Sequence, residues 1–559
     1  MLTAINLFDY LEASAEQGGA AEHWAARTPA RPNRDFDIKL VPRSSGWQDD
    51  PGALEALRRI EAEPWVGGLT RRENGVELRI DDSWIETVGS SLYEGDGGDE
   101  SLGDLARGQR YAVQFWDANA TKALHAGHLR NLAIGNALAA ALTQAGAQVE
   151  RRSLIADAGR SMGEAMAGVM KSGRHAQAWP DRNEKSDHFV GCCYAEYVAA
   201  GRAINGNGAV EHPEDSLTRE LKMHHDEADE LLRRVLSGDR QALELWYKTR
   251  AWVISGQRKT LARLGIPFDR VFFESDFLSE IAELGDFGLR EGLLERREDG
   301  VVMYATGRED FDEFPLLRGG DDLPTQHMRT MAFWVAAPEL EGITSVQVCG
   351  TEWVPHGVCR RQLMAELMPD RTEPQHPNHE IYHGMVSRQK RALASSEEGA
   401  LLIDELTERL EGQIEHDAYG PEVIAKLGSA ERVAATVALG YFLTRPVAQH
   451  IDFDPEKLLD ERESPGWVLA RARARAGQAP TSSEPPVHDP DYRFAVVQSQ
   501  LHRRHLRLTV ERLDALPLAR YVVHLARWYL ERDRSEHVER VVHTLLERGS
   551  RGLGLESSP

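Results

Sequence analysis

The chain has 559 residues, of which 41% are hydrophobic and 28% are charged, and this length suits about three or four globular domains. The composition excludes a mostly disordered chain, a collagen and a small disulfide-rich protein. Its 66 basic and 89 acidic residues give a net charge of −23. That charge disfavours a protein that coats nucleic acid through bulk charge, although a local basic face stays possible.

Segments that would direct the chain to a membrane or out of the cell are not predicted. The N-terminus has no basic start followed by an apolar run, and no apolar stretch approaches the roughly 18 residues of a membrane span. The four cysteines contain no Cys-x-x-Cys pair, so we interpret them as reduced structural residues. We therefore expect a soluble cytoplasmic protein that does not bind a membrane.

Residues 1–105 have the pattern of a small separate α+β domain. Val76, Leu78 and Ile80 alternate with other residues, as in a half-buried strand. The acidic, glycine-rich run at 94–99 then indicates a linker to the rest of the chain.

A strand–loop–helix–strand pattern follows this first domain. Residues 111–116 and 149–155 are apolar runs suited to buried strands, and apolar residues recur at helical spacing over 129–145. This order predicts a βαβ unit and therefore an α/β fold with a parallel, Rossmann-like nucleotide-binding sheet. We assign this sheet to a domain spanning 106–405.

The rest of the chain is predicted to be mainly helical in two regions. We interpret residues from about 165 to 300 as a helical insertion in the second domain, although short strand patterns return from residue 271 onwards. Residues 406–559 have apolar stripes at helical spacing, which predict an all-α third domain. A proline-rich loop at 477–491 interrupts it.

The segment Asn119-Ala-Thr-Lys122-Ala-Leu-His125-Ala-Gly127-His128 lies between the first predicted strand and its helix. Ligands bind at this edge of parallel sheets, and a helix N-terminus suits a phosphate group. Gly127 would let a nucleotide approach the backbone, and both histidines could donate hydrogen bonds to phosphoryl oxygens. Lys122 would add a positive charge. Taken alone, the two histidines are also compatible with metal ligands or with ordinary core or surface residues.

In this position the Lys-x-x-His-x-Gly-His pattern resembles the ATP signature of class I aminoacyl-tRNA synthetases, and the spacing from Asn119 to Lys122 resembles the arginyl-tRNA synthetase branch. Weaker similarities follow in the family's order at Asp157-Ala-Gly159 with Gly163, Phe268-Asp269, Glu274-Ser275, Tyr304-Ala-Thr306, Gly350-Thr-Glu352 with His356, Phe442-Leu443 and Ile451-Asp-Phe453-Asp454. The resemblance covers most of the chain and implies a class I catalytic domain followed by a helical anticodon-binding-like domain.

The resemblance implies an enzyme that activates an amino acid with ATP and Mg²⁺ and transfers it from the adenylate to tRNA. It implies catalytic roles for Lys122, His125, His128 and Lys390. Contacts to ATP would come from His125, Gly127, His128, Gly350, Glu352, His356, Ser395 and Ser396. Contacts to the amino acid would come from Gln114, Asn119, Asp157, Tyr304, Arg308 and Trp353.

Three positions depart from the arginyl pattern. The family has an acid where this chain has Gln114, an aspartate where it has Arg308, and a glutamine where it has Trp353. A guanidinium keeps its charge at any working pH and is usually paired with carboxylates, so these changes predict weak or absent activation of free arginine. The alternatives are that the short motifs are misaligned, or that Glu309, Asp310 or another acid such as Glu352 restores the pocket through a shifted loop.

The family's second ATP signature, a flexible loop rich in lysine and serine, has a weak counterpart at 387–399. Its two serines match in spacing, but Leu393 stands at a lysine position and Glu397 at an arginine position. Lys390 and Arg391 could substitute from upstream, and Lys122 could supply the remaining charge. The alternative is that adenylation is impaired.

The C-terminal end offers a candidate tRNA surface, because residues 501–559 contain 11 arginines and 8 acids. Among them, the residues predicted to face tRNA phosphates are Arg503, Arg504, Arg507 and Arg512. An ordinary solvated helix face is the alternative.

Three functions therefore stay open. The first is an arginyl-tRNA synthetase-like ligase, which we expect to be a monomer. The second is a biosynthetic paralogue that activates another amino acid or uses a small-molecule acceptor, and the altered pocket favours it. The third is a non-catalytic RNA-binding regulator, which the weak second signature favours and the intact histidine motif opposes.

Overall fold

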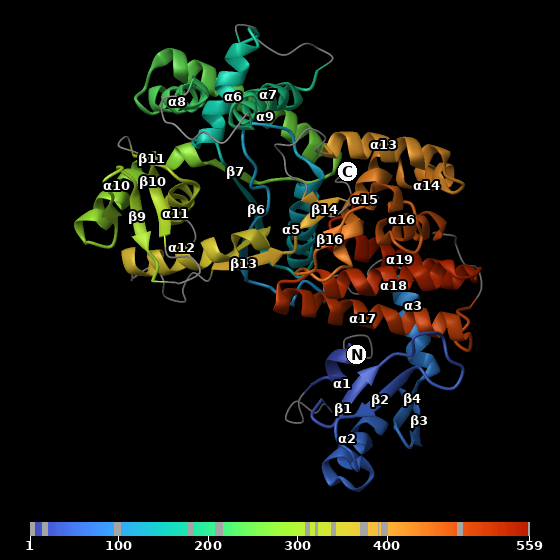
Figure 1. The fold of residues 1–559 in the computed structure, drawn as a ribbon. Helices are drawn as coiled ribbons and strands as arrows, with labels where there is room; N and C mark the ends of the chain where they lie inside the picture. Colours follow the sequence, from blue (N-terminus) through green and yellow to red (C-terminus); the bar gives the residue numbers. More distant parts are fainter. Residues whose placement is uncertain are drawn as a thin grey trace.

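The computed structural model describes residues 6–13, 21–93, 102–175, 184–206, 216–307, 313–318, 322–336, 342–368, 378–388, 391–392, 401–477 and 484–556. Within them a central parallel sheet lies between an all-helical region and a small lobe, and the N-terminal unit docks against the last helices (Figure 1). No helix in these residues is long and apolar enough to cross a membrane.

The N-terminal unit is built on a four-stranded antiparallel sheet with the strand order β1-β2-β4-β3. Its elements are α1 (Leu7–Leu11), β1 (Trp24–Arg27), β2 (Ile38–Pro42), α2 (Pro51–Glu61), β3 (Val66–Arg72), β4 (Gly75–Ile80) and α3 (Asp82–Tyr93). The predicted alternation is present in β4, where Val76, Leu78 and Ile80 are buried. The prediction of a small N-terminal α+β unit is therefore confirmed.

The central sheet has five parallel strands in the order β13-β12-β5-β6-β7. They are β5 (Arg110–Gln114), β6 (Gln148–Ile155), β7 (Arg270–Phe273), β12 (Thr344–Gly350) and β13 (Asn378–His383). The first predicted strand is the middle strand of this sheet, and it is joined to β6 through α5 (Ala126–Gln144). The predicted βαβ unit and the parallel α/β fold are therefore confirmed.

Helix α5 is buried along nearly its whole length and begins three residues before the predicted start, because His125 supplies its N-cap. A close approach to β5 requires Gly135, since a Cβ there would lie 2.2 Å from the Phe115 ring. The fully buried Arg130 donates hydrogen bonds to the carbonyl oxygens of Gly384, Pro446, Val447 and Gln449. Helix α5 thus fastens the sheet to the helical region that follows it in sequence.

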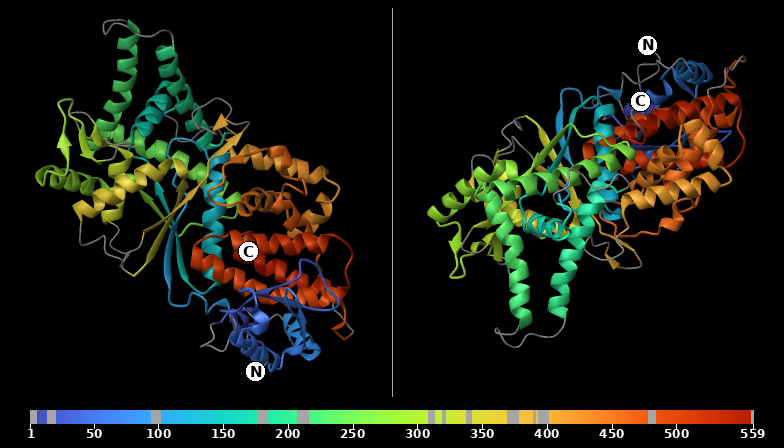
Figure 2. Two further views of the ribbon diagram at one scale, coloured as in Figure 1. Left: turned by 60° about the horizontal axis from the view of Figure 1, so that its bottom comes forward. Right: turned by 90° about the horizontal axis from the view of Figure 1, so that it is seen from above.

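Between β6 and β7 the chain makes the predicted helical excursion. Its helices are α6 (Arg160–Lys171), α7 (Ser186–Gly206), α8 (Ser216–Leu236) and α9 (Arg240–Arg263). Helices α7 and α8 project from the body of the molecule (Figure 2). The excursion ends earlier than predicted, because β7 already belongs to the central sheet.

A small lobe follows β7 and contains a second, antiparallel sheet with the order β11-β10-β9-β8. Its elements are α10 (Leu278–Arg290), β8 (Glu295–Arg296), β9 (Val302–Ala305), β10 (Glu313–Arg318), β11 (Leu323–Pro324), α11 (Gln326–Ala336) and, after β12, α12 (Val354–Leu367). The lobe has a hydrophobic cluster of its own, which includes Tyr304, Phe314 and Met328.

The C-terminal region is helical, as predicted. It contains α13 (Ile403–His416), α14 (Gly420–Leu427), α15 (Ala430–Leu443), α16 (Pro465–Arg475), α17 (Pro490–Arg512), α18 (Leu516–Leu530) and α19 (Glu536–Gly552). A three-stranded sheet of β14 (Val386–Arg388), β15 (Arg391–Ala392) and β16 (Ile451–Asp452) joins it to the strands before it.

The N-terminal unit is held to α17 by Arg493, a guanidinium with no exposed surface. Arg493 donates two hydrogen bonds to the carboxylate of Asp37, at 3.0 and 2.7 Å. A buried arginine is tolerated only when its donors are satisfied, so this pair fixes the two regions together. The exact domain boundaries of 1–105, 106–405 and 406–559 stay a prediction.

Candidate active site

A cavity of about 370 Å³ lies at the carboxyl ends of β5, β6 and β12. This sheet-edge cavity is lined by Asp117, Asn119, Lys122, His125, Gly127, His128, Asn131, Leu154, Ala156, Glu274, Gln326, Thr330, Gln347, Val348, Cys349, Gly350, Glu352, Trp353, Arg360, His383, Met385 and Val386. The whole predicted histidine motif, the Gly350–Trp353 strand end and Asn119 therefore meet in one place, where ligands bind in parallel sheets.

A glutamine side chain of α9, Gln257, holds the loop between β5 and α5 in place. Gln257 donates hydrogen bonds to the backbone carbonyls of Asn119 (3.2 Å) and Lys122 (2.7 Å). The same side chain accepts a hydrogen bond from the indole of Trp116 at 3.2 Å. Gln257 is itself buried, so the long predicted insertion has a structural role in shaping the motif loop.

The two motif histidines have their ring orientation set by the backbone. The Nδ1 atom of His125 accepts a hydrogen bond from the N–H of Gly127 at 3.1 Å, and the Nδ1 atom of His128 accepts one from the N–H of His125 at 3.1 Å. Because a neutral imidazole carries one proton, both protons then sit on Nε2. Among the described residues, the hydrogen bonds found for the two rings involve Nδ1, which leaves each Nε2–H in position to donate to a ligand.

Burial keeps both rings neutral. It lowers the pKa of His125 to about 4, with a smaller contribution from the charge of Lys122, and it lowers the pKa of His128 well below its usual value. The site is therefore a pair of neutral donors at the start of α5, where the helix dipole also favours an anion.

Lys122 lies beside these histidines, with its Nζ atom 5.4 Å from the centre of the Tyr194 ring. Burial lowers the pKa of Lys122 to about 8. Helix α7 comes close to this lysine, since a Cβ on Gly191 would lie 3.3 Å from the Lys122 Cβ. The lysine is therefore positioned by the helical excursion, and an anionic ligand would restore its affinity for a proton.

Two acidic residues of the sheet-edge cavity had not been singled out from the sequence as charge carriers. Asp117 follows β5, and burial raises the pKa of its carboxyl group. Glu274 follows β7, accepts a hydrogen bond from Arg329, and has its pKa raised to about 7 by burial. Asp117 comes after β5 and Glu274 comes after β7, and both strands belong to the parallel sheet. This position after a strand could have identified both acids as candidate site residues from the sequence.

Three residues predicted to contact the amino acid, Gln114, Asp157 and Tyr304, do not line the cavity. Asp157 is buried and is bound by Arg250 and Ser275, each at 2.8 Å. The hydroxyl of Tyr304 donates to Glu366 at 2.7 Å in the small lobe. Their predicted roles as amino-acid contacts stay predictions.

The remaining residues predicted to contact the amino acid or ATP, or to act in catalysis, fall into two groups. Trp353 lines the cavity and packs near His356, with ring centres 5.3 Å apart. His356 itself stacks on His327 and does not line the cavity. The side chains at 308, 390, 395 and 396, predicted as Arg308, Lys390, Ser395 and Ser396, lie outside the described residues.

The chain that follows the predicted second signature is attached directly to the histidine motif. The carbonyl of Leu401 accepts a hydrogen bond from Ala126 N–H at 2.8 Å, and Ile403 N–H donates to the carbonyl of Leu124 at 3.0 Å. The next residue, Asp404, is buried. The start of α13 and the start of α5 are thus one connected structure.

Asp404 belongs to a charged cluster with Asp187 and His188 whose ligand atoms are close enough to hold a metal ion. The ammonium of Lys185 already lies 2.9 Å from Asp187, 2.7 Å from Asp404 and 2.6 Å from the Thr260 hydroxyl. We therefore interpret the cluster as an ion-pair network, since a cation already occupies the position between the carboxylates.

The arginines predicted to face tRNA lie on α17, where most of them contact the N-terminal unit. Asp9 is bound by Arg503 at 2.6 Å and by Arg507 at 2.7 Å, and Arg504 lies 2.5 Å from Glu12. These pairs fasten α1 to α17. The predicted tRNA role of Arg503, Arg504, Arg507 and Arg512 stays a prediction.

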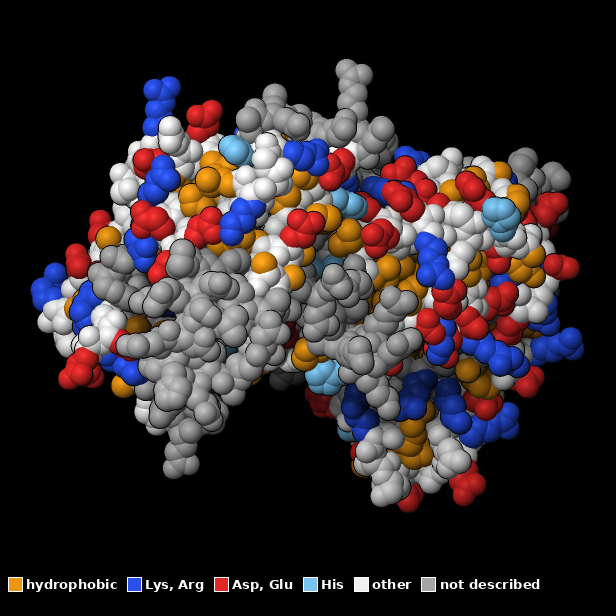
Figure 3. All heavy atoms as spheres, turned by 45° about the horizontal axis from the view of Figure 1, so that its top comes forward, with side chains coloured by type: hydrophobic (Ala, Val, Ile, Leu, Met, Phe, Trp, Pro, Cys, Tyr) orange, Lys and Arg blue, Asp and Glu red, His pale blue; other side chains and the backbone are white. Residues whose placement is uncertain are grey.

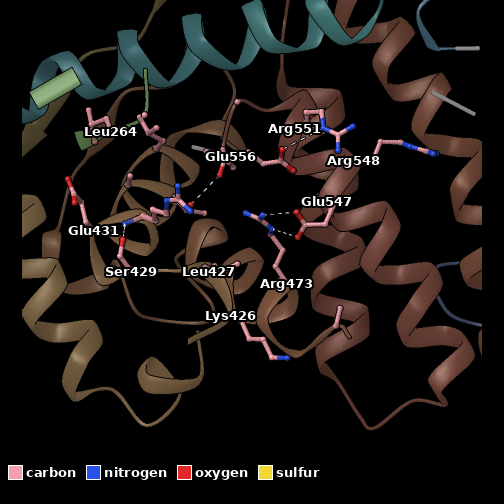
Figure 4. Close-up of a pocket in the computed structure, with 18 of the residues that line it drawn as sticks. Leu264, Lys426, Leu427, Ser429, Glu431, Arg473, Glu547, Arg548, Arg551 and Glu556 are labelled. Atoms are coloured by element: carbon pink, nitrogen blue, oxygen red, sulfur yellow. Dashed lines mark hydrogen bonds and ion pairs between the residues drawn. The ribbon is translucent and has the colours of Figure 1, made fainter. Parts of the chain in front are cut away.

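A second, larger cavity of about 1030 Å³ lies between α9 and the C-terminal helices (Figure 4). The charged residues of this helical cavity are Arg263, Lys426, Glu431, Arg432, Arg473, Glu547, Arg548, Arg551 and Glu556. Its acids are matched by arginines: Arg473 donates to Glu547 at 2.9 and 2.8 Å, and Arg551 lies 3.6 Å from Glu556. Of the predicted ATP and amino-acid residues that the structure describes, none lines it.

The comparisons with known proteins agree with this geometry. Residues 99–189 match the family model described as tRNA synthetases class I (R), catalytic domain. An arginine–tRNA ligase of Amoebophilus asiaticus is 29% identical over 393 residues, which cover 66% of this chain and 62% of that protein. One of Borrelia hermsii is 31% identical over 202 residues, which cover 36% of this chain and 31% of that protein. The chain thus matches less than two thirds of the length of these relatives.

The fold comparison extends over the whole molecule. The solved arginyl-tRNA synthetase of Thermus thermophilus superimposes with a TM-score of 0.67 at 18% identity, covering 99% of this chain and 98% of that one. The chain therefore resembles class I arginine–tRNA ligases in sequence and has the arginyl-tRNA synthetase fold.

Proposed function

We propose that the chain is an ATP-dependent ligase of the arginyl-tRNA synthetase type. It joins an amino acid to ATP as an aminoacyl adenylate and then transfers the aminoacyl group to tRNA. The observation that carries the proposal is the pair of neutral Nε2–H donors of His125 and His128 at the start of α5, inside the sheet-edge cavity. The names of the sequence relatives support arginine as the first amino acid to test.

In this reaction an oxygen of the amino-acid carboxylate attacks the α-phosphorus of ATP, and pyrophosphate leaves. Negative charge builds on the phosphoryl oxygens during the displacement, so donors fixed beforehand stabilise the transition state more than the ground state. The two histidines, the N-terminus of α5 and Lys122 are such groups in this cavity. Their backbone hydrogen bonds reduce the reorganisation that the reaction would otherwise need.

Mg²⁺ is the metal that would accompany ATP. It is bound mainly by phosphate oxygens and water, with one or two carboxylates, and it neutralises phosphate charge. Glu352 is an exposed carboxylate that lines the cavity. We assign it to the side of the cavity that holds the nucleotide.

The acceptor is proposed to be tRNA, and the enzyme is proposed to work as a monomer in the cytoplasm. Acidic and basic side chains are interspersed over the face drawn in Figure 3, so tRNA would be held by local arginines and lysines instead of one extended basic field. Candidate contacts are Arg512 on α17 and, in the helical cavity, Lys426 and Arg432.

The two other functions raised by the sequence are less well supported. A biosynthetic paralogue was favoured by Gln114, Arg308 and Trp353, but the cavity contains an acid, Asp117, three residues after Gln114. A non-catalytic regulator would not need ordered histidine rings at a cavity. Both rings of the motif are held by backbone hydrogen bonds and line the cavity, which argues against this function.

The test is ATP–pyrophosphate exchange by the purified full chain with each of the common amino acids, with and without tRNA. We expect exchange that depends on one amino acid, with arginine as the first candidate. Exchange that appears only when tRNA is added would also support the proposal. The absence of exchange with every amino acid under both conditions would reject it.

A further inference from the structure

A buried carboxylate at the start of α13 is held by segments that are distant from it in the chain. Asp404 is 5% exposed. Its Oδ2 atom accepts a hydrogen bond from the ammonium of Lys185 at 2.7 Å and lies 2.9 Å from His188 Nε2. The hydroxyl of Thr260 lies 3.0 and 3.1 Å from its two oxygens. Because Lys185 directly precedes α7 and Thr260 belongs to α9, the helical excursion fixes Asp404 from two helices.

The residues just before Asp404 are paired with the histidine motif. Leu402 forms an antiparallel β-bridge with His125. The hydrogen bonds of this bridge involve Leu124 and Ala126, the residues directly before and after the histidine. Only one residue separates Leu402 from Asp404. A shift of Asp404 would therefore be passed to the backbone on both sides of His125.

One face of α9 supports both halves of the motif loop. Gln257 and Thr260 are three residues apart in this helix, so their side chains lie on the same face. Gln257 binds the backbone carbonyls of Asn119 and Lys122 in the first half of the loop. Thr260 binds Asp404, which is connected to the second half through the β-bridge. The position of the motif therefore depends on side chains that lie outside the cavity.

A buried ion network carries a desolvation cost and adds little net stability, whereas its several short contacts define one geometry. Accurate geometry matters at a reacting centre, where a displacement of about 1 Å can cost about 10² in rate. We propose that Asp404 is a positioning residue for His125, because it fixes the bridge partner of the histidine and so keeps the Nε2–H donor in place. The inference rests on the proposed function.

The test is steady-state ATP–pyrophosphate exchange by the full chain and by Asp404→Asn, with tRNA present. Asparagine keeps the shape of the side chain but not the charge that holds Lys185. We expect kcat to fall by about 10- to 100-fold, the scale for a displaced reacting group. The KM for ATP should stay within about threefold, because the groups that line the cavity are unchanged. Thr260→Val removes one hydroxyl and no charge, so it provides a milder variant whose kcat should fall by about two- to fivefold.

Glu411→Gln is the matched control. Glu411 lies two turns after Asp404 on α13 and accepts hydrogen bonds from Arg263 of α9 at 3.2 and 2.6 Å. The variant therefore removes a charge pair between the same two helices without touching the β-bridge. It should lower the melting temperature and leave kcat unchanged at a temperature well below melting. A loss of kcat of the same size in Glu411→Gln and Asp404→Asn would show a general structural effect and overturn the inference.

Amide hydrogen exchange followed by mass spectrometry needs no turnover, and it distinguishes failure of this inference from failure of the proposed function. The N–H groups of Ala126 and Ile403 donate the two hydrogen bonds of the β-bridge. Peptides that contain them should exchange about tenfold faster in Asp404→Asn and at an unchanged rate in Glu411→Gln. Faster exchange at both peptides supports the inference even if no amino acid supports pyrophosphate exchange. Unchanged hydrogen exchange in Asp404→Asn overturns it, and so does an unchanged kcat.

Discussion

The sheet-edge cavity and the helical cavity differ in how their charged groups are satisfied. In the helical cavity, Glu547 receives two hydrogen bonds from Arg473, so the charges of the protein neutralise each other. In the sheet-edge cavity, Asp117 is held by neutral amides and both motif histidines are held by backbone N–H groups. Charges that are paired within the protein stabilise its structure, whereas oriented groups that keep unused hydrogen-bonding capacity are available to a ligand.

This contrast shows why the size of a cavity is a poor guide to function here. The helical cavity has a volume of about 1030 Å³ and the sheet-edge cavity about 370 Å³. The smaller one combines a helix N-terminus, neutral histidine donors and a carboxylate that is hydrogen-bonded by neutral amides. We therefore propose that the chemistry takes place in the smaller cavity.

The largest expected effect on activity concerns His128 in the sheet-edge cavity. His128→Ala removes one fixed donor and should lower the rate of ATP–pyrophosphate exchange by about 10²–10³, the scale for one oxyanion-type donor. The matched control is His416→Ala, which changes an exposed histidine of α13. An unchanged exchange rate in His128→Ala would remove the motif from the mechanism.

Substitutions in the helical cavity should change the stability of the protein and not its rate of ATP–pyrophosphate exchange. Arg473→Met leaves the carboxylate of Glu547 without its partner and should lower the free energy of unfolding by about 1–3 kcal/mol. Exchange measured well below the melting temperature should stay within about twofold. The double variant with Glu547→Gln should regain part of the loss, since the unpaired charge is removed. Loss of exchange at unchanged stability would show that this cavity takes part in the reaction.

A pH effect is expected from the network at the start of α13, which connects to the histidine motif. Hydrogen bonds from His188 and Lys185 outweigh burial and lower the pKa of Asp404 to about 2. Its ordinary value is about 3.9, so Asp404 contributes stability above about pH 4, and the contribution is lost as the pH falls towards 2. Urea unfolding of the unaltered chain should therefore lose stability over this window.

Asp404→Asn provides the control for this pH effect. The variant should be less stable at neutral pH, and its stability should fall less steeply between pH 4 and pH 2. Identical pH profiles for the two proteins would show that the Asp404 network does not contribute in this way.

The smallest expected effect concerns tRNA. Lys426 and Arg432 lie in the helical cavity and are both exposed. The variant with Lys426→Glu and Arg432→Glu should bind tRNA a few fold more weakly and with a shallower dependence on salt, because fewer phosphates are contacted. Arg503→Ala should instead lower stability through loss of its pair with Asp9. If the double variant bound tRNA normally and Arg503→Ala bound it more weakly, the tRNA surface would instead lie on α17.

The sequence predicted those parts of the fold that depend on local pattern. Hydrophobic periodicity identifies elements that bury one face or both. Examples are β4 with its alternation, α18 with its helical spacing, and β5 and β6 with their apolar runs. Strand β7 was also recognised as a strand. Its membership of the central sheet could not be predicted, because a hundred or so residues of helical excursion separate it from its partner β6.

The candidate site was predicted as far as a contiguous motif defines it. The segment from Asn119 to His128 lies where the strand–loop–helix pattern places it, at the sheet edge. Contacts between segments that are distant in the chain could not be predicted from the sequence. Gln257 holds the motif loop from a distance of 138 residues along the chain, and the pair of Asp117 with Gln347 spans 230 residues. Such contacts depend on the order of the strands, which no local pattern records.

Whether the groups of the sheet-edge cavity join an amino acid to tRNA is tested most directly by an aminoacylation assay. The purified full chain would be incubated with labelled arginine, ATP, Mg²⁺ and total tRNA, and the label in acid-precipitated tRNA would be counted. We expect ATP-dependent labelling that His128→Ala reduces by about 10²–10³ and that Arg473→Met leaves nearly unchanged. Labelling that is equal in the unaltered chain and His128→Ala, or absent in the unaltered chain with every amino acid supplied, would contradict this expectation.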